Sequence, residues 1–195
     1  MENDHPAAEL DDALDSRLAQ RLAGLRTERG WSLDDLAQST GISRATLSRL
    51  ERGETSPTAN LLGKLCSTYG LTMSRLLGEL EQQGARLIPR SAQQTWIDPE
   101  TGFQRRLVSP PSRGFRMEMI EGALPAGAVI AYDAAPVRGM EQHMWMLGGV
   151  LDYTLDGVAY RLNPGDCLRF HIFGPTRFSC PGPDAAHYLI IVCEP

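Results

Sequence analysis

The chain has 195 residues, enough for one large domain or two small ones, because domains usually contain ~100–150 residues. Hydrophobic residues make up 42% of the sequence, and no apolar run is long enough to cross a bilayer. The first residues lack the charged-then-apolar pattern of a signal peptide. These features argue against a membrane-spanning or secreted protein, and we expect a cytoplasmic one.

The net charge of −5 is unevenly distributed along the chain. Residues 1–13 carry five acidic residues and no Lys or Arg, and we expect them to form a mobile acidic tail. Residues 14–76 contain nine Lys or Arg against six Asp or Glu, a local excess of +3. Because DNA affinity depends on local phosphate contacts, this segment can bind DNA, but tight binding is expected to need a dimer.

Four cysteines are present, and their spacing matches none of the CxxC or CxxH patterns of structural zinc sites: Cys66, Cys167, Cys180 and Cys193. We therefore expect buried, reduced thiols, as is usual in a cytoplasmic protein. The alternative is a redox-sensing pair among the last three cysteines.

The segment 32–53 predicts two short amphipathic helices joined by a tight turn. Ser32 is expected to cap the first helix by accepting a hydrogen bond from the amide of Asp35. Gly41 can supply the left-handed backbone of the turn, and Ser43 can cap the second helix. The outward face of that second helix is polar and cationic, as in a helix-turn-helix recognition helix: Arg44, Ala45, Thr46, Ser48, Arg49 and Arg52.

Three further helices are expected to complete an all-α bundle. Apolar residues at positions 14, 18, 22 and 25 predict a helix over 14–28. A fourth helix is expected over 58–69 and a fifth over 72–77. The five-helix domain then spans residues 14–78, and the polar segment 79–88 is expected to be a linker.

Residues 13–77 resemble the lambda-repressor/Cro-like (XRE) DNA-binding domain, with the turns and core positions in register. The matching features are Trp31-Ser32-Leu33, Leu36-Ala37, Gly41-Ile42-Ser43, Leu47-Ser48, Glu51-Arg52-Gly53 and Pro57. The resemblance implies binding to double-stranded DNA, with a dimer reading two half-sites about 34 Å apart on a palindromic operator.

Specific DNA contacts follow from the resemblance and from side-chain chemistry. The start of the recognition helix is expected to meet base edges through Arg44, Ala45, Thr46 and Arg49. Hydroxyl, amide and guanidinium groups nearby are expected to contact phosphates: Ser32, Ser43, Ser48, Arg52 and Asn60. The carboxylate of Glu51 cannot favour phosphate, and we expect it to pair with Arg26 of the first helix.

After residue 88 Pro and Gly become frequent, and short β-favouring runs alternate with turns such as Asp156-Gly157 and Asn163-Pro164-Gly165-Asp166. This alternation predicts an all-β sandwich or barrel over residues 89–195. The expected strands are Gln104–Val108, Arg116–Ile120, His143–Leu147, Val150–Leu155, Val158–Leu162, Cys167–Phe170 and Tyr188–Val192.

Three segments of this region resemble the single-domain cupins, which are small double-stranded β-helix barrels: Leu124–Tyr132, Glu141–Phe170 and Phe173–Gly182. The turns at Gly148-Gly149 and Gly165-Asp166 are the landmarks. Within that family the chain is most similar to the sensor half of XRE–cupin transcriptional regulators. The implied architecture has two domains, an N-terminal all-α five-helix bundle and a C-terminal all-β cupin barrel that is also the expected dimer interface.

Most catalytic cupins hold a metal inside the barrel with three His and one Glu. The resemblance places those positions at Ala135, Val137, Gln142 and Thr176, none of which is a strong ligand for a transition metal. We therefore expect no metal, no cofactor and no enzymatic activity. The remaining histidines in strand-like runs are interpreted as packing residues: His143, His171 and His187.

A barrel without a metal can still bind a small, partly apolar effector. The side chains that suit such a pocket are Met117, Met119, Tyr132, Gln142, Met144, Met146, Arg169 and Phe178. The alternative is that these side chains are simply barrel core. If Arg169 faces inward, it requires an anion, either a protein carboxylate or the effector's.

We expect a dimeric transcriptional regulator that binds DNA through its bundle and senses a small molecule through a metal-free cupin barrel. Two other functions are compatible with the sequence. One is a metal-dependent cupin enzyme fused to a DNA-binding domain, which stoichiometric iron, zinc or manganese in the purified protein would indicate. The other is an antitoxin-like DNA binder whose barrel only dimerises.

Overall fold

The computed structural model describes residues 6–77, 86–112 and 115–193, with side chains from Asp15 onward. The chain divides into two compact units, residues 1–57 and 58–195. No helix of the described residues is long and apolar enough to cross a membrane.

The first unit contains three helices, α1 (Pro6–Glu28), α2 (Leu33–Thr40) and α3 (Arg44–Glu51). Helix α1 begins eight residues before the expected Leu14 and so includes residues 6–13 of the segment predicted to be a mobile tail, while residues 1–5 lie outside the described residues. The early start has a physical reason. Pro6 is favourable at the first helical position, and the Ala, Glu and Leu residues that follow it are good helix formers.

The turn between α2 and α3 has the expected local chemistry. The Ser32 hydroxyl accepts from the amide of Asp35, whose carboxylate accepts from the Ser32 amide, which closes a reciprocal capping box. Gly41 ends α2 in the left-handed conformation with φ 69°, and Ser43 caps α3 by accepting from the amide of Thr46. The predicted helix-turn-helix geometry is therefore confirmed.

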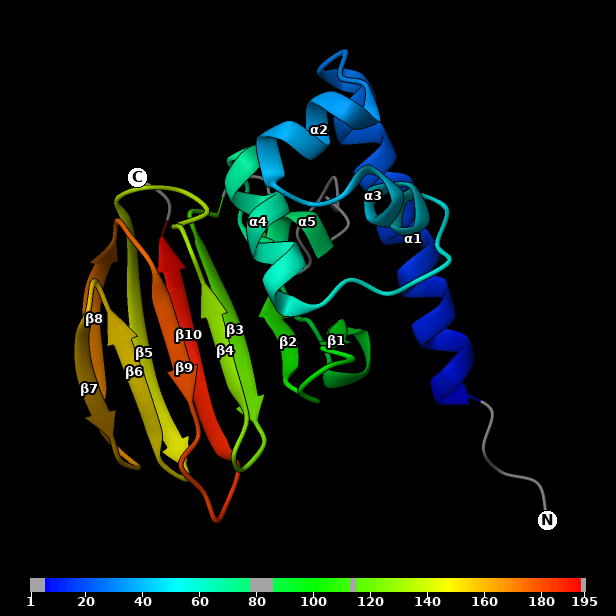
Figure 1. Ribbon diagram of the computed structural model, residues 1–195. Helices are drawn as coiled ribbons and strands as arrows, with labels where there is room; N and C mark the ends of the chain where they lie inside the picture. Colours follow the sequence, from blue (N-terminus) through cyan, green and yellow to red (C-terminus); the bar gives the residue numbers. More distant parts are fainter. Residues whose placement is uncertain (1–5, 78–85, 113–114, 194–195) are drawn as a thin grey trace. The chain divides into compact units, whose positions relative to one another are not determined.

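The second unit begins with helices α4 (Ala59–Tyr69) and α5 (Met73–Leu77) and a 3-10 turn, η1 (Arg90–Ala92). Two antiparallel sheets follow, which lie face to face in Figure 1. One has the strand order β1-β2-β3-β10-β5-β8: β1 (Thr95–Ile97), β2 (Gln104–Ser109), β3 (Met117–Leu124), β10 (Ala186–Cys193), β5 (Met140–Gly148) and β8 (Cys167–Ile172). The other has the order β4-β9-β6-β7: β4 (Val129–Tyr132), β9 (Thr176–Ser179), β6 (Leu151–Leu155) and β7 (Val158–Leu162).

All seven expected strands are present, and the sequence missed β1, β4 and β9. Each missed strand has only three or four residues, too few to show a period-two pattern. Of the expected linker, residues 79–85 lie outside the described residues, and residues 86–88 have no regular secondary structure.

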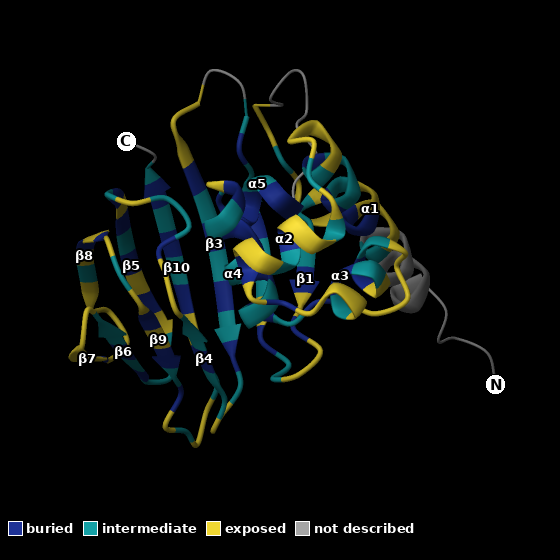
Figure 2. Cartoon of the chain, turned by 45° about the horizontal axis from the view of Figure 1, so that its top comes forward, coloured by how far each residue is buried: buried dark blue, intermediate teal, exposed yellow. Residues whose placement is uncertain are grey.

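Alternation of buried and exposed residues along the strands defines an inner and an outer face of the six-stranded sheet (Figure 2). On β5 the side chains of Gln142, Met144 and Met146 are buried, whereas Trp145 and Leu147 are about half exposed. The inward parity expected for β5 is therefore confirmed.

Helices α4 and α5 belong to the same compact unit as the barrel, although the sequence suggested a domain of residues 14–78. The backbone amide of Ala59 donates to the carboxylate of Asp98 over 3.0 Å. Gly63 lies so close to Tyr132 that an added Cβ would stand 2.5 Å from its ring. Arg105 of β2 donates to the hydroxyl of Ser74 in α5, so both helices form part of the barrel's wall.

Candidate functional site

The outward face of α3 is available for contact with a large ligand. Arg44, Ala45 and Arg49 are exposed, and Thr46 is half-buried, with its hydroxyl 2.8 Å from that of Ser43. Leu47 and Leu50 turn to the opposite side and are buried in the first unit. The sequence-predicted base-contacting residues therefore share one face of one helix.

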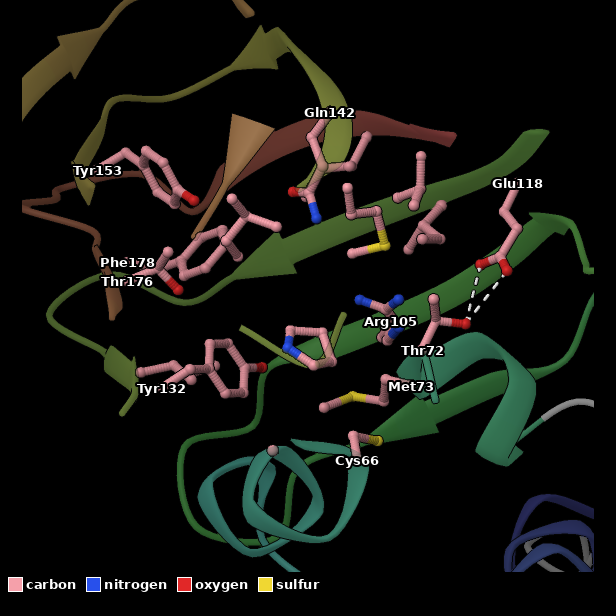
Figure 3. Close-up of a pocket in the computed structure, with 18 of the residues that line it drawn as sticks. Cys66, Thr72, Met73, Arg105, Glu118, Tyr132, Gln142, Tyr153, Thr176 and Phe178 are labelled. Atoms are coloured by element: carbon pink, nitrogen blue, oxygen red, sulfur yellow. Dashed lines mark hydrogen bonds between the residues drawn. The ribbon is translucent and has the colours of Figure 1, made fainter. Parts of the chain in front are cut away.

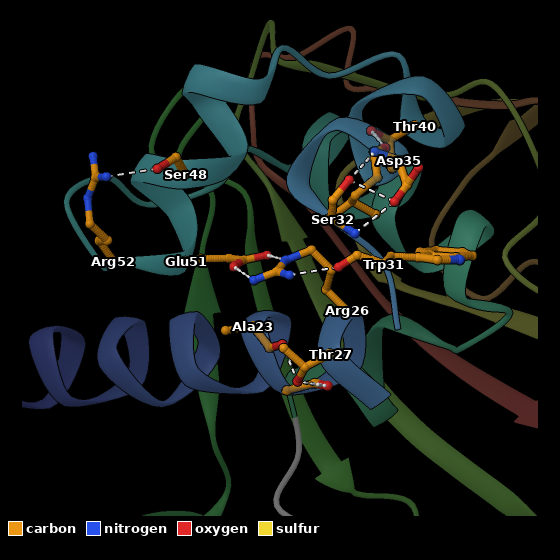
Figure 4. A network of polar contacts seen from close by, with 12 residues as sticks. Ala23, Arg26, Thr27, Trp31, Ser32, Asp35, Thr40, Ser48, Glu51 and Arg52 are labelled. Carbon is orange, nitrogen blue, oxygen red and sulfur yellow. Dashed lines mark hydrogen bonds and ion pairs between the residues drawn. The ribbon is translucent and has the colours of Figure 1, made fainter. Parts of the chain in front are cut away.

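Two arginines on or beside this face form exposed ion pairs with carboxylates. Arg44 lies 3.3 Å from the carboxylate of Asp34. Arg52 donates to the Ser48 hydroxyl (Figure 4). It also donates to both oxygens of Glu54, and its guanidinium lowers the pKa of Glu54. Because exposed pairs of this kind contribute little net stability, phosphate can replace the carboxylate partner at small cost.

Two of the expected phosphate contacts have other partners. The Ser32 hydroxyl donates to Asp35 over 2.7 Å while it caps α2, and this hydrogen bond lowers the pKa of the Asp35 carboxyl. The side-chain amide of Asn60 donates to the carbonyl of Ala131 over 3.2 Å within the second unit. The Asn60 amide therefore holds strand β4 in this structure, and its contact with phosphate stays a prediction.

A cavity lies in the second unit between the two sheets, with α4 and α5 closing part of its wall (Figure 3). Its volume is about 90 Å³, several times the ~10–15 Å³ that one water molecule requires in the same measure. Apolar and aromatic side chains dominate the lining, and the polar groups include Gln142, Thr176, Thr72, Glu118 and Arg105.

Three of the eight expected pocket residues line this cavity: Tyr132, Gln142 and Phe178. Met144 and Met146 point inward but are fully packed core, at 0% and 1% exposure.

The other three expected pocket residues are corrected, because strand parity places them on the outer face of the six-stranded sheet. Met117 is 59% exposed, Met119 is half-buried, and Arg169 is exposed between its half-buried and buried neighbours on β8.

Several cavity residues were missed by the sequence analysis, above all Arg105, Glu118 and Thr72. The Thr72 hydroxyl lies 3.1 Å and 3.5 Å from the two carboxylate oxygens of Glu118, to which it donates. Arg105 donates from Nη2 to the hydroxyl of Ser74 over 3.0 Å. The predicted strand Gln104–Val108 could have identified Arg105. Arg105 lies two residues before the buried Leu107, so both side chains lie on the same face of the strand.

Burial keeps the nucleophilic and phenolic groups of the cavity protonated. Desolvation raises the pKa of the Cys66 thiol to about 12 and that of the Tyr132 phenol to about 12. The same cause raises the pKa of Tyr153 and of Tyr188. These phenols therefore remain neutral hydrogen-bonding groups, and Cys66 is an unreactive thiol.

The side chains at the expected ligand positions do not suit the transition metal that catalytic cupins hold. The positions expected to carry ligands hold Ala135 and Val137, which cannot donate, and Gln142 and Thr176, which are weak ligands. Among the residues described, no three His, Cys, Asp or Glu side chains gather closely enough to hold a metal ion.

The three histidines of the strands lie on the other face of the sheet from the cavity. His143 is 2.8 Å from Glu141 on β5, and this contact lowers the pKa of the Glu141 carboxyl. His171 and His187 are exposed. None of the four cysteines forms a disulfide, and Cys167 is exposed, contrary to the expectation of buried thiols.

Comparisons with known proteins cover both units. Residues 22–76 match the family described as Helix-turn-helix (HTH_3). The chain is 30% identical over 185 residues to the HTH-type transcriptional regulator SutR of Escherichia coli (strain K12), covering 91% of this chain and 95% of SutR. It is 24% identical over 171 residues to the HTH-type transcriptional regulator PuuR of the same organism, covering 82% and 85%. The crystal structure of an HTH_3 family transcriptional regulator from Vibrio cholerae matches with a TM-score of 0.76 and 26% identity, covering 95% of this chain and 99% of that one.

Proposed function

The chain belongs to the HTH-type transcriptional regulators with a cupin-like second domain, and from this premise we propose that α3 reads an operator while the barrel senses a small effector. The observation that carries the proposal is the exposed face of α3, which presents Arg44, Ala45 and Arg49 together after a capped turn. A guanidinium matches the acceptors of guanine, and the small Ala45 suits a thymine methyl group.

Thr46 on the same face is proposed to contact a base edge, and phosphate contacts are proposed for the polar groups around it: Ser32, Ser43, Ser48 and Arg52. Their hydroxyl and guanidinium groups are exposed or half-buried on the first unit. The amides that open α2 and α3 add the positive end of each helix dipole. The local excess of only +3 means that one copy binds weakly.

We further propose that the regulator acts as a dimer on a palindromic operator in the cytoplasm. Support for the dimer comes from the weak local charge and from apolar side chains on the outer sheet face, where Met117, Trp145 and Leu147 are 47–59% exposed. Sedimentation at micromolar concentration should give about twice the chain mass of 21.4 kDa. A mass equal to that of one chain would contradict the dimer.

The barrel is proposed to bind its effector without a metal and without catalysing a reaction. The support is chemical, because Ala135 and Val137 offer no donor and Gln142 and Thr176 are neutral. Neutral hydroxyl and amide groups in a largely apolar cavity suit an organic molecule.

The proposed readout is tested by isolating operator fragments and measuring the Arg49→Ala variant on them. Genomic fragments captured by the intact protein define the operator. Arg49→Ala should weaken operator binding and relax preference at one base pair by ~1–3 kcal/mol. Arg177→Ala, which removes an exposed cation from β9, is the matched control and should bind like wild type. An equal loss on operator and on random DNA would make Arg49 a phosphate contact and contradict its role in base readout.

A further inference from the structure

The cavity wall carries one cation whose hydrogen-bonding capacity is largely unused. Arg105 on β2 lies opposite Gly122 on β3. A side chain at Gly122 would stand 2.4 Å from the ring of Tyr188, so that ring occupies the space beside the strand at this level. Arg105 and Tyr188 both line the cavity, one charged and one aromatic.

The Arg105 guanidinium has a single protein hydrogen-bond acceptor among the described residues, the Ser74 hydroxyl. Its Nε is buried with no hydrogen-bond partner, and no described carboxylate forms an ion pair with it. A guanidinium has five N–H donors, and leaving a charge uncompensated in a mainly apolar cavity is costly. An anion that enters the cavity would remove this cost.

The surroundings of Arg105 restrict the kind of anion. In the view of Figure 3, Glu118 and Thr72 lie on one side of Arg105, and Tyr132, Tyr153 and Phe178 lie on the other. The Glu118 carboxylate, 4% exposed, adds a negative charge that disfavours a doubly charged phosphate. The aromatic side chains can pack against an apolar part of the ligand.

We propose that the cavity binds a small organic carboxylate with an apolar or aromatic body, its carboxylate on the Arg105 guanidinium. A carboxylate presents two coplanar oxygens that match two parallel N–H groups of arginine. This inference rests on the proposed function and names the chemical class of its effector. The cavity volume of about 90 Å³ limits the ligand to a small molecule.

The same guanidinium also contacts the helical part of the wall. Ser74, fully buried in the first turn of α5, accepts from Arg105, and Thr72 just before that helix donates to Glu118. A carboxylate on Arg105 would use donors that Ser74 leaves free, on the same guanidinium that holds Ser74. Ligand binding is thereby coupled to the contacts of α5, which lies in the segment matched by the helix-turn-helix family.

Calorimetry and thermal unfolding of the full-length protein test the proposal with defined probes. Benzoate, phenylacetate and 3-phenylpropanoate at up to 20 mM are compared with their neutral amides and with benzylamine. At least one carboxylate should raise the unfolding temperature of the wild type and bind at least tenfold more tightly than its amide. Failure of all three carboxylates to bind, or equal binding of carboxylate and amide, would overturn the proposal.

Variants then assign the binding to Arg105. Arg105→Gln should lose the carboxylate preference at least tenfold, Arg105→Lys should keep part of it, and Arg169→Gln, on the outer face, should bind like wild type. Circular dichroism checks that each variant folds. If Arg105→Gln does not fold, the role of Arg105 is decided by Arg105→Lys and by the comparison of carboxylates with amides on the wild type. Unchanged carboxylate affinity in Arg105→Lys and Arg105→Gln would overturn the assignment.

Operator binding without any ligand separates this inference from the function on which it rests. Wild-type protein that binds carboxylates but no operator would contradict the proposed function alone. Wild-type protein that binds its operator but none of the carboxylates would contradict the inference alone.

Discussion

A single pair of residues, Arg26 and Glu51, connects the end of α1 to the end of α3. Arg26 donates from Nε and Nη2 to the two carboxylate oxygens of Glu51, each over 2.8 Å, and from Nη1 to the carbonyl of Trp31 (Figure 4). The two side chains are only 18% and 10% exposed. The pairing expected from the sequence is confirmed by these contacts, and each charge is compensated by the other.

Replacing Glu51 by alanine should leave the Arg26 charge half-buried with one partner fewer. Loss of one member of a buried pair costs on the order of 3 kcal/mol, so the unfolding free energy in urea should fall by about that amount. Glu54→Ala, which removes the partner of Arg52 from an exposed pair, is the control and should leave the urea midpoint unchanged. Equal midpoints for both variants would show that burial does not strengthen the Arg26 pair.

At the scale of elements, helix α2 shows how local chemistry fixes the helix-turn-helix. It has only eight residues, too short to be stable alone, yet both of its ends are capped. The capping box of Ser32 and Asp35 closes the start, and Gly41 in the left-handed conformation closes the end. The angle between α2 and α3 depends on these caps, because each helix ends where its orphan groups find partners.

The capping box predicts a specific dependence of stability on pH. The pKa of Asp35 is lowered from its ordinary value of 3.8, chiefly by the Ser32 hydrogen bond. A carboxyl with a lowered folded-state pKa stabilises the fold above the unfolded value, and this contribution is lost as the pH falls through the folded value. Asp35→Asn should therefore melt below wild type at pH 7, with the difference shrinking toward pH 3. A difference that stays constant over this range would contradict the role of the Asp35 charge.

Sequence patterns predicted the helices and the longer strands because these elements carry their own signals. Caps at Ser32 and Ser43 and the glycine at 41 are local, so they could be identified without tertiary information. Strands β4 and β9 are four residues each and depend on pairing with one another, which no local pattern encodes.

The cavity was only partly predictable, since its lining depends on strand parity and on which helix covers the barrel. The alternation of inward and outward side chains along β5 was predicted correctly, and it identified Gln142 as a residue that lines the cavity. On β8 no parity was inferred, and Arg169 was left as a conditional pocket residue. The contribution of Cys66 and Met73 could not be expected, because it requires α4 and α5 to pack against the strands.

At the scale of the whole molecule, the compact units do not coincide with the family match. The helix-turn-helix match extends to residue 76, whereas the second compact unit begins at Thr58. Contacts such as Ala59 with Asp98 and Ser74 with Arg105 join α4 and α5 to the strands. Both helices therefore belong to the compact unit of the barrel as well as to the matched segment.

A fragment of residues 58–195 should unfold cooperatively, whereas a fragment of residues 89–195 should be less stable. The shorter fragment lacks the helices that cover Ile130, Tyr132 and the cavity, so it should expose apolar surface and bind a hydrophobic dye. Thermal unfolding and dye fluorescence measure both effects, with the full chain as reference. Equal melting temperatures of the two fragments would mean that α4 and α5 add nothing to the barrel.

The shared wall of the cavity has a consequence for how regulators of this kind diversify. A substitution at Cys66 or Met73 changes the lining of the cavity and a helix of the matched segment in one step. Recombination in the segment 79–88 would deliver a foreign barrel without its helical wall. Recombination just after Pro57 would carry the wall with the barrel, so exchange of ligand specificity between lineages should favour crossover points there.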